Sequence, residues 1–283
     1  MRIAVMSDIH GNYHALSACV KHAKASGVEG FWFLGDYVGE FPNPQRTLEL
    51  LYQLREEYDC VFIRGNKEDY LLDGKYNSEC EWKRGNKTVG AIKYSYENVT
   101  DEDLEFFESM PISKRIEIEG MEPVLICHGA AESNKQKLLP GVFETEVTIA
   151  CYSEKYVFCG HTHVQQVIKD DTKLVVNPGA VGVPLNIKGS AQYMLIESEG
   201  KEWKTTFITI PIDVAAIEDE IRASKLMEYA PYWCRSVIHL LKTGEFSQGT
   251  VLNEAMRIND YQEPWYIVPD ECWEKALARF NIG

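Results

Sequence analysis

The 283-residue sequence has no long hydrophobic run and no apolar leader. No apolar stretch approaches the roughly 18 residues that a membrane-spanning helix needs. The N-terminal run meets the charged Asp8 too early to form the apolar core of a signal peptide. Low-complexity segments and internal repeats are also missing, and a composition of 45% hydrophobic and 25% charged residues is typical of a globular protein. We therefore expect a cytoplasmic soluble protein that makes no contact with a membrane.

Positive charge is scarce. Lys and Arg together number 29 against 43 Asp and Glu, which gives a formal net charge of −14. Because nucleic-acid binding depends on basic side chains that neutralise phosphates, no stable nucleic-acid complex is expected. A polyanionic substrate would need a strongly positive local site, and bound metal ions are one way to supply it.

The eight cysteines include no Cys-x-x-Cys pair. A chain of this length needs no disulfide in order to fold, and the sequence gives no sign of export. Several of the cysteines lie inside apolar runs, as at Cys127 and Cys159. We therefore expect most of them to be reduced core residues.

The first half of the chain alternates short apolar runs with amphipathic stretches. The runs at 3–6, 31–34, 60–63 and 124–127 are each followed within two residues by Gly, Asp, Asn or His. Residues 13–26 and 44–58, between the first three runs, have apolar residues at helical spacing. This β-α-β-α order predicts a sheet covered by helices, with ligand chemistry at the carboxyl ends of the strands.

A helical insertion, a second set of strands and a helical C-terminal part are expected to follow. Thr100 and Asp103 form a capping-box pattern before an apolar run that Pro111 ends. Residues 116–210 are strand-like with fewer helices, which predicts a second sheet with some antiparallel strands. The helical stretches after Pro211 lie at 213–228, 232–243, 248–258 and 269–280. We divide the chain into a domain at 1–212 and a helical extension at 213–283, which packs on that domain or on a dimer partner.

The aromatic residues outside the strands are expected to serve packing. Trp82, Tyr94 and Tyr96 lie in the insertion, where core packing is favoured over stacking on a nucleobase. The extension contains three tryptophans that are expected to pack it onto the main body or onto a second subunit: Trp233, Trp265 and Trp273.

Five short polar motifs each follow an apolar run. They are Asp8-Ile9-His10, Gly35-Asp36-Tyr37-Val38-Gly39, Gly65-Asn66-Lys67-Glu68, Cys127-His128-Gly129 and Gly160-His161-Thr162-His163. In an extended strand, residues two apart point to the same face, so each Asp-x-His or His-x-His pair can act as one two-pronged ligand set. The His, Asp and Asn side chains of these motifs suit transition metals. Seven such groups are too many for one tetrahedral site, which favours two adjacent metals that share a carboxylate.

These motifs resemble the signature of the calcineurin-like metallophosphoesterases: Asp-x-His, Gly-Asp-x-x-Gly, Gly-Asn-His-Asp/Glu, a strand-end His, and Gly-His-x-His. Residues 41–44 and 177–179 resemble the compact bacterial and archaeal phosphodiesterase branch of that superfamily. The resemblance spans residues 1 to about 210. It implies an α/β fold in four layers, an α/β/β/α sandwich of two mixed sheets flanked by helices, to which this chain adds its C-terminal helical extension.

The resemblance also implies the ligands and the reaction. The first metal would take Asp8, His10, His163 and the bridging Asp36, and the second would share Asp36 and add Asn66, His128 and His161. The two ions would be manganese, iron or zinc with a bridging hydroxide. That hydroxide would attack phosphorus in a small phosphodiester or a nucleotide phosphoanhydride, such as a dinucleoside polyphosphate.

Lys67 departs from the family pattern, which usually has His after the Gly-Asn pair and uses it to protonate the departing oxygen. A lysine with the ordinary pKa of about 10.4 is a poor proton donor at neutral pH, although its charge can offset that of a leaving group. As a catalytic residue, Lys67 therefore predicts a preference for good leaving groups. In the alternative interpretation, Lys67 only pairs with Glu68 or Asp69 at the edge of the site.

Two other functions are compatible with the resemblance. The first is a nuclease similar to the DNA-repair members of the superfamily, which the acidic balance disfavours. The second is a protein-binding scaffold, as in the retromer subunit with this fold. A scaffold would be expected to have lost metal-binding histidines, whereas His10, His128, His161 and His163 are all present.

Overall fold

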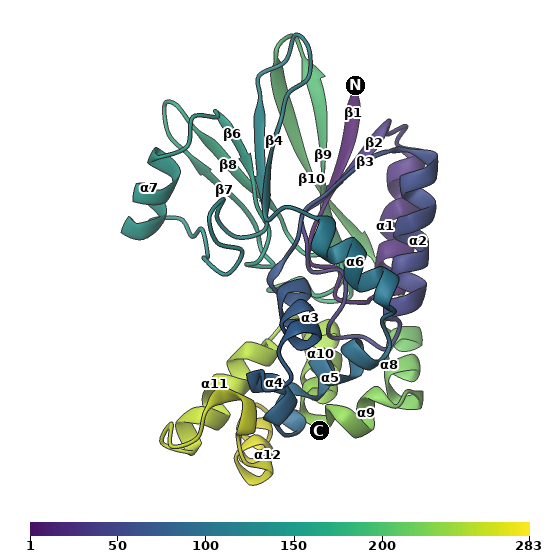
Figure 1. Ribbon diagram of the computed structural model, residues 1–283, viewed down its shortest axis with the longest axis vertical. Helices are drawn as coiled ribbons and strands as arrows, with labels where there is room; N and C mark the ends of the chain where they lie inside the picture. Colours follow the sequence, from purple (N-terminus) through teal and green to yellow (C-terminus); the bar gives the residue numbers. More distant parts are fainter.

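A computed structural model describes residues 1–283 and contains two five-stranded sheets that face each other, with helices outside them (Figure 1). The first sheet has the order β10-β9-β1-β2-β3 and the second the order β4-β5-β6-β8-β7. The strands are β1 (Arg2–Met6), β2 (Gly30–Phe33), β3 (Asp59–Phe62), β4 (Ser113–Ile116), β5 (Val124–Cys127), β6 (Tyr156–Phe158), β7 (Gln165–Lys169), β8 (Leu174–Pro178), β9 (Ser190–Glu199) and β10 (Glu202–Pro211). The predicted fold class, two mixed sheets flanked by helices, is confirmed.

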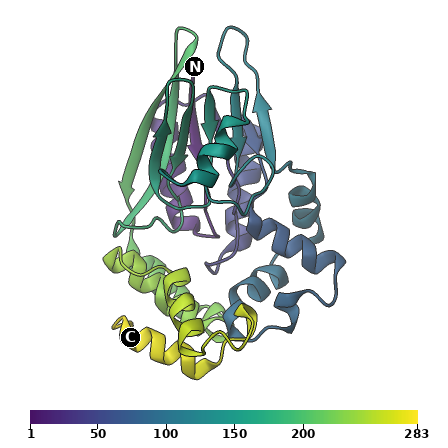
Figure 2. The same cartoon turned by 90° about the vertical axis from the view of Figure 1, so that its left-hand side faces the viewer.

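The helices lie outside the sheets and beyond the ends of their strands (Figures 1 and 2). They are α1 (Tyr13–Ala25), α2 (Pro44–Glu57), α3 (Asn66–Tyr76), α4 (Glu81–Arg84), α5 (Gly90–Glu97), α6 (Asp101–Ser109), α7 (Phe143–Ala150), α8 (Val214–Ala223), α9 (Leu226–Tyr229), α10 (Pro231–Thr243), α11 (Gln248–Ile258) and α12 (Asp270–Arg279), with 3₁₀ turns η1 (Lys87–Val89) and η2 (Trp265–Ile267). No helix of the chain is both long enough and apolar enough to cross a membrane.

The predicted β-α-β-α order is present in the first sheet. Strands β1, β2 and β3 are parallel neighbours, and α1 and α2 connect them. The Asn12 side chain caps α1 by accepting the Ala15 N–H at 3.1 Å. Leu16 and Leu51 are buried with the strand residues Phe31 and Phe33 in one core of 29 residues. The helices thus bury one face of the sheet. A turn follows the carboxyl end of each of these parallel strands.

The prediction for the last two strands was wrong in one respect. The strand-like runs near 192–197 and 205–210 do form β9 and β10, but these strands belong to the first sheet. Strand β9 pairs antiparallel with β1, from Arg2 opposite Glu197 to Val5 opposite Met194, and β10 pairs with β9. The physical reason is that β1 is buried on both faces. Strand β2 pairs with only one edge of β1, and β9 pairs with the other edge. The local sequence specifies a strand but not its partner.

The second sheet is mixed, as predicted. Strands β5, β6 and β8 are parallel, and β4 and β7 pair antiparallel at its two edges. Helix α7, which the sequence pattern did not indicate, covers its outer face (Figure 2). Trp32 and Trp203 from the first sheet and Phe158 from the second pack between the sheets in a core of 13 residues. All eight cysteines are free, and six are buried.

The remaining helices form a layer at the end of the sheets opposite to the N-terminus (Figure 1). Helix α6 begins at the predicted capping box, in which Thr100 accepts the Asp103 N–H. From Val214 onward the chain is helical, close to the predicted ranges. The extension contacts the helices of the first half through α5 with α9 and through η1 with η2. It therefore packs on its own chain, and the domain division at residue 212 stays a prediction.

Candidate metal centre

The seven predicted ligand residues all lie just beyond the carboxyl ends of five strands. Asp8 and His10 follow β1, Asp36 follows β2 and Asn66 follows β3 in the first sheet. In the second sheet, His128 follows β5, and His161 and His163 follow β6. Five of the seven are buried, and the other two, His161 and His163, are partly exposed. The site is therefore a pocket floor made by both sheets, open to solvent on the side of these two histidines.

Five of these residues have backbones in the left-handed region. Their φ values are 56° for Asp8, 57° for His10, 56° for Asp36, 67° for His161 and 59° for His163. Such conformations cost about 1–3 kcal/mol each for residues other than glycine, and persist only where the surroundings fix them. The carbonyl of Asp36 accepts the N–H groups of Ile9 and His10, both at 2.9 Å. The strand-end turns thus hold one another in the shape that aims these side chains inward.

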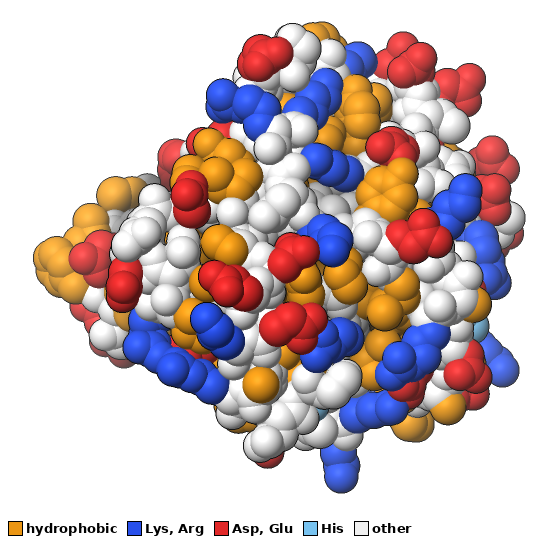
Figure 3. All heavy atoms as spheres, turned by 90° about the horizontal axis from the view of Figure 1, so that it is seen from below, with side chains coloured by type: hydrophobic (Ala, Val, Ile, Leu, Met, Phe, Trp, Pro, Cys, Tyr) orange, Lys and Arg blue, Asp and Glu red, His pale blue; other side chains and the backbone are white.

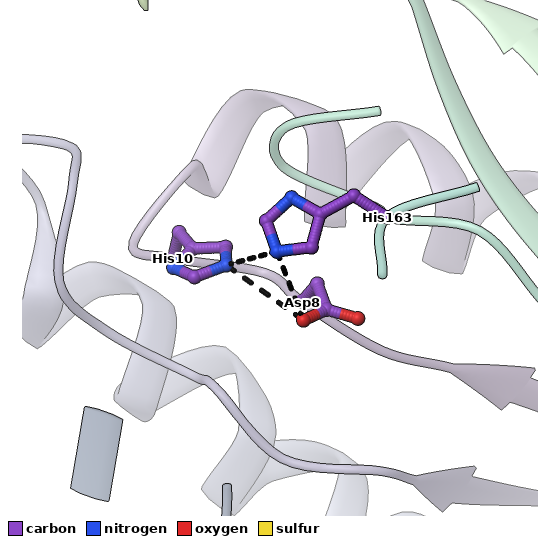
Figure 4. A group of neighbouring side chains, drawn as sticks. All are labelled: Asp8, His10 and His163. Carbon is purple, nitrogen blue, oxygen red and sulfur yellow. Dashed lines mark hydrogen bonds and ion pairs between the residues drawn. The ribbon is translucent and has the colours of Figure 1, made fainter. Parts of the chain in front are cut away.

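Asp8, His10 and His163 form the first cluster of donor atoms (Figure 4). The Nε2 atoms of His10 and His163 are 3.2 Å apart, and the carboxylate oxygen Oδ1 of Asp8 lies 3.2 Å from His163 Nε2. The same Asp8 oxygen is 3.8 Å from His10 Nε2. The three side chains, from two sheets, point at one common position.

A second cluster lies beside the first. Asp36 Oδ2 is 3.5 Å from His128 Nε2 and 3.7 Å from His10 Nε2, so it lies between the two clusters. The amide oxygen of Asn66 is 3.2 Å from His128 Nε2. Asp8 also reaches this cluster, with its Oδ1 at 3.9 Å from His128 Nε2.

The structure places His161 at the edge of the second cluster. Its ring centroid is 5.1 Å from that of His128, and its Nε2 lies 3.1 Å from the carbonyl oxygen of Lys135. The three donors Asp8, Asp36 and His128 come within reach of one ion without it. Of the seven predicted residues, His161 is thus the one whose side chain does not point at a position that the other donors share.

The histidine hydrogen bonds test whether this donor set fits a cation. His163 Nδ1 lies 2.9 Å from the carbonyl of Val183, and His128 Nδ1 lies 2.7 Å from that of Leu34. A carbonyl accepts a hydrogen bond, so each Nδ1 carries a proton, and when the ring is neutral its Nε2 turns a bare lone pair into the cluster. Asp8 Oδ1 is buried there without a hydrogen-bond partner. With neutral rings, these lone pairs face one another with no donor between them, an arrangement that fits a bound cation.

The charges of the site also call for a cation. Burial opposes ionisation of Asp36, but His128 outweighs it, so the pKa of Asp36 is held below its ordinary value. Burial likewise disfavours a charged His128, but Asp36 and Asp8 prevail and raise the pKa of His128 to about 10. Two ionised carboxylates in a buried pocket thus require positive charge, which metal ions supply without protonating a ligand nitrogen.

Glu68 is a positioning residue that the sequence motifs contained but whose role we did not predict. Its side chain is fully buried and accepts three backbone N–H groups, from Asp36 at 2.9 Å, Tyr37 at 2.8 Å and Gly65 at 2.9 Å. It therefore ties the turn after β2 to the start of α3. A Cβ atom on Gly65 would collide with the Asp36 carboxylate, which explains why glycine precedes Asn66.

Lys67 pairs with a partner that the sequence did not indicate. Its Nζ lies 3.2 Å from Oε1 of Glu40, a buried residue whose other oxygen accepts a 2.7 Å hydrogen bond from Gln248 of the extension. The predicted alternative partners are engaged elsewhere, Glu68 by backbone N–H groups and Asp69 by Arg64 at 2.6 Å. Burial disfavours the charged lysine, but Glu40 and Asp36 prevail and raise the pKa of Lys67. Lys67 is therefore a fixed cation beside the two clusters.

A sandwich of two mixed sheets with Asp, His and Asn side chains clustered at its strand ends is the arrangement expected of a metal-dependent hydrolase of the phosphoesterase class. The family model of the calcineurin-like phosphoesterase superfamily domain matches residues 1–201. The chain belongs to this superfamily, and it is a phosphoesterase with Asp and His groups that can bind metals. The predicted family and enzyme class are confirmed.

Relatives of known sequence or structure resemble most of the chain. An uncharacterized protein of Methanocaldococcus jannaschii is 28% identical over 242 residues, which cover 80% of this chain and 94% of the relative. The crystal structure of a hypothetical protein from Pyrococcus horikoshii superimposes with a TM-score of 0.72 at 24% identity, over 87% of this chain and 99% of that one. The crystal structure of a metallophosphoesterase from Sphaerobacter thermophilus superimposes with a TM-score of 0.66 at 23% identity, over 87% of this chain and 100% of that one. These likenesses extend the shared fold into the helical extension.

Proposed function

We propose that this phosphoesterase hydrolyses a small phosphodiester or a nucleotide phosphoanhydride at two transition-metal ions: manganese, iron or zinc. The observation that supports it is the pair of donor clusters joined by Asp8 and Asp36. In this proposal Asp8, His10, His163 and Asp36 hold one ion, and Asp36, Asn66, His128 and His161 hold the other. When bound, such ions neutralise phosphate oxygens and make the attacking water acidic.

The chain's own residues position and neutralise the substrate. A cleft of about 220 Å³ opens above the clusters, and its lining includes Glu40, Lys67, Lys137, His161 and His163. Lys67 is paired with Glu40, and Lys137 adds positive charge at the wall in a protein whose net charge is −14. His161 lies at the cleft wall, and in this proposal its side chain turns from the Lys135 carbonyl toward the second cluster.

The mixed charge of one face of the molecule supports a small substrate. On the face seen in Figure 3, Lys and Arg side chains are interspersed with Asp and Glu, and no continuous basic stripe crosses it. A nuclease needs such a stripe to hold the backbone. A small phosphorylated molecule, nucleotides included, is thus the proposed partner. A homodimer and a cytoplasmic location stay predictions.

A turnover screen with manganese tests this function. The substrates are bis-p-nitrophenyl phosphate, p-nitrophenyl phosphate, cyclic nucleotides, diadenosine tetraphosphate and single-stranded DNA. We expect turnover of a diester or of the tetraphosphate, and loss of that turnover on treatment with a chelator, with recovery when manganese is restored. Cleavage of DNA alone, with affinity that falls steeply as salt is raised, would instead show the nuclease.

Replacing Lys67 with histidine tests the role of the fixed cation. A histidine at this position can donate a proton to a poor leaving group, and general acids contribute about a hundredfold or more to such steps. The ratio of monoesterase to diesterase kcat is therefore expected to rise by about tenfold or more in Lys67→His. Lys169→His, at an exposed lysine outside the cleft, is the matched control. An unchanged ratio in Lys67→His would show that Lys67 plays no part in choosing the leaving group.

A further inference from the structure

We infer that a second cavity beside the cleft is a binding pocket for a planar aromatic group of the substrate, such as a nucleobase. This inference rests on the proposed function, because it assigns a substrate part to a pocket next to the metal clusters. The cavity measures about 370 Å³, within the usual range of small-molecule pockets, and lies between the helices of the first half and those of the extension.

Aromatic and aliphatic side chains from both helical segments make the walls. Tyr70 and Ile92 come from α3 and α5. Trp233, Leu252 and Trp265 come from α10, α11 and η2 of the extension. The rings of Tyr70 and Trp265 are 6.2 Å apart at a tilt of 46°, so they form two adjoining walls. Flat faces of this kind suit a stacked ring.

The pocket adjoins the cleft above the metal clusters. Lys67 and Trp233 line both cavities, and Asn66, a proposed metal ligand, lines the aromatic one. Lys67 Nζ lies 5.8 Å from the centre of the Trp233 ring. A molecule with its phosphate at the clusters would therefore pass Lys67 and meet the aromatic walls next.

One wall residue has a hydrogen-bond donor without a partner. The indole N–H nitrogen of Trp233 is buried and makes no hydrogen bond within the protein. A base nitrogen or carbonyl oxygen would accept from it only after the Trp233 side chain turned its N–H toward the cavity. The inference therefore rests on the aromatic walls.

The aromatic residues of the insertion serve packing instead, as predicted from the sequence. Trp82 and Tyr94 are buried, and their polar atoms already donate, Trp82 Nε1 to the carbonyl of Tyr70 at 2.8 Å and the Tyr94 hydroxyl to that of Pro42 at 3.0 Å. Trp273 is likewise buried and donates to Thr88 at 2.9 Å. Of the three tryptophans in the extension, Trp233 and Trp265 therefore line the cavity, and only Trp273 packs wholly inside.

Binding of matched ligand pairs tests the pocket. We would titrate the full chain with adenosine monophosphate against ribose 5-phosphate, and with phenyl phosphate against methyl phosphate, by calorimetry. Each pair has the same phosphate and differs in the ring. With manganese, adenosine monophosphate is expected to bind about tenfold more tightly than ribose 5-phosphate, the equivalent of about 1.4 kcal/mol. If phenyl phosphate bound as tightly as adenosine monophosphate, any aryl ring would suffice. If it bound more weakly, the pocket would recognise the base itself.

Two variants and a control decide the location. Trp233→Ala removes one wall, and Leu252→Trp fills the cavity without removing a wall. Both are expected to abolish the preference for the ring-bearing ligand, whereas Tyr261→Ala, at an exposed aromatic outside the cavity, is expected to keep it. Equal binding of the paired ligands by the unaltered protein, or a preference that survives both variants, would overturn the inference. Repeating the titration in a chelator separates this inference from the proposed function. The preference for the ring-bearing ligand needs no metal, so it should persist there even if the metal-dependent activity is not found.

Discussion

Replacing Asp36 with asparagine is expected to lower kcat by at least about a thousandfold, since neutralising phosphate charge at metal centres supplies several kcal/mol. Asp36 Oδ2 lies between the two donor clusters, 3.7 Å from His10 and 3.5 Å from His128. An amide keeps the shape of the side chain. Its oxygen can still accept the 2.8 Å hydrogen bond that the backbone N–H of Lys67 donates to Oδ1 of Asp36. The substitution therefore removes charge while the surrounding turn stays in place.

Steady-state turnover with manganese and the metal content of the purified variant measure this effect together. We expect Asp36→Asn to retain fewer than two ions per chain. Asp171→Asn, at an exposed position, should retain both the metal and the activity. Thermal unfolding in a chelator checks that the variant is folded. Full turnover by Asp36→Asn with two bound ions would contradict the proposed bridging role.

Glu68→Ala is expected to destabilise the protein by about 4 kcal/mol, a loss of about 10 °C in melting temperature. The Glu68 carboxylate accepts the N–H groups of Asp36, Tyr37 and Gly65, and all three contacts are buried. Alanine leaves these donors without partners, and each buried unsatisfied donor costs about 1–3 kcal/mol before the chain relaxes. The same change frees the Asp36 turn, so manganese affinity should fall as well.

Urea and thermal unfolding in a chelator isolate the stability effect from the metal. Glu68→Gln should lose less than Glu68→Ala, because its amide oxygen still accepts hydrogen bonds. Glu56→Ala, at an exposed position of α2, should change stability by no more than about 0.5 kcal/mol, as is usual for surface substitutions. If Glu68→Ala melted at the temperature of the unaltered protein, the carboxylate would not be holding the two turns together.

The strand-end motifs could be predicted because their information is local. Asp8 and His10 lie within four residues of an apolar run, and parallel strands bring all such turns to one edge of a sheet. The partner of a strand is not local information, so β9 and β10 were assigned to the wrong sheet. The contacts around Lys67 were missed for the same reason, since Glu40 and Gln248 are 208 residues apart in the chain.

The separation of Glu40 and Gln248 along the chain has a consequence for how substrate specificity can change. The matched superfamily domain ends at residue 201, whereas Trp233, Gln248, Leu252 and Trp265, all beyond it, border the two cavities. In our proposals, part of the substrate selectivity is therefore encoded in a stretch of the chain that contains none of the predicted metal ligands. Exchanging residues 213–283 for those of a relative would be the most direct way to redirect the enzyme toward a new substrate, with the residues that bind metal left untouched.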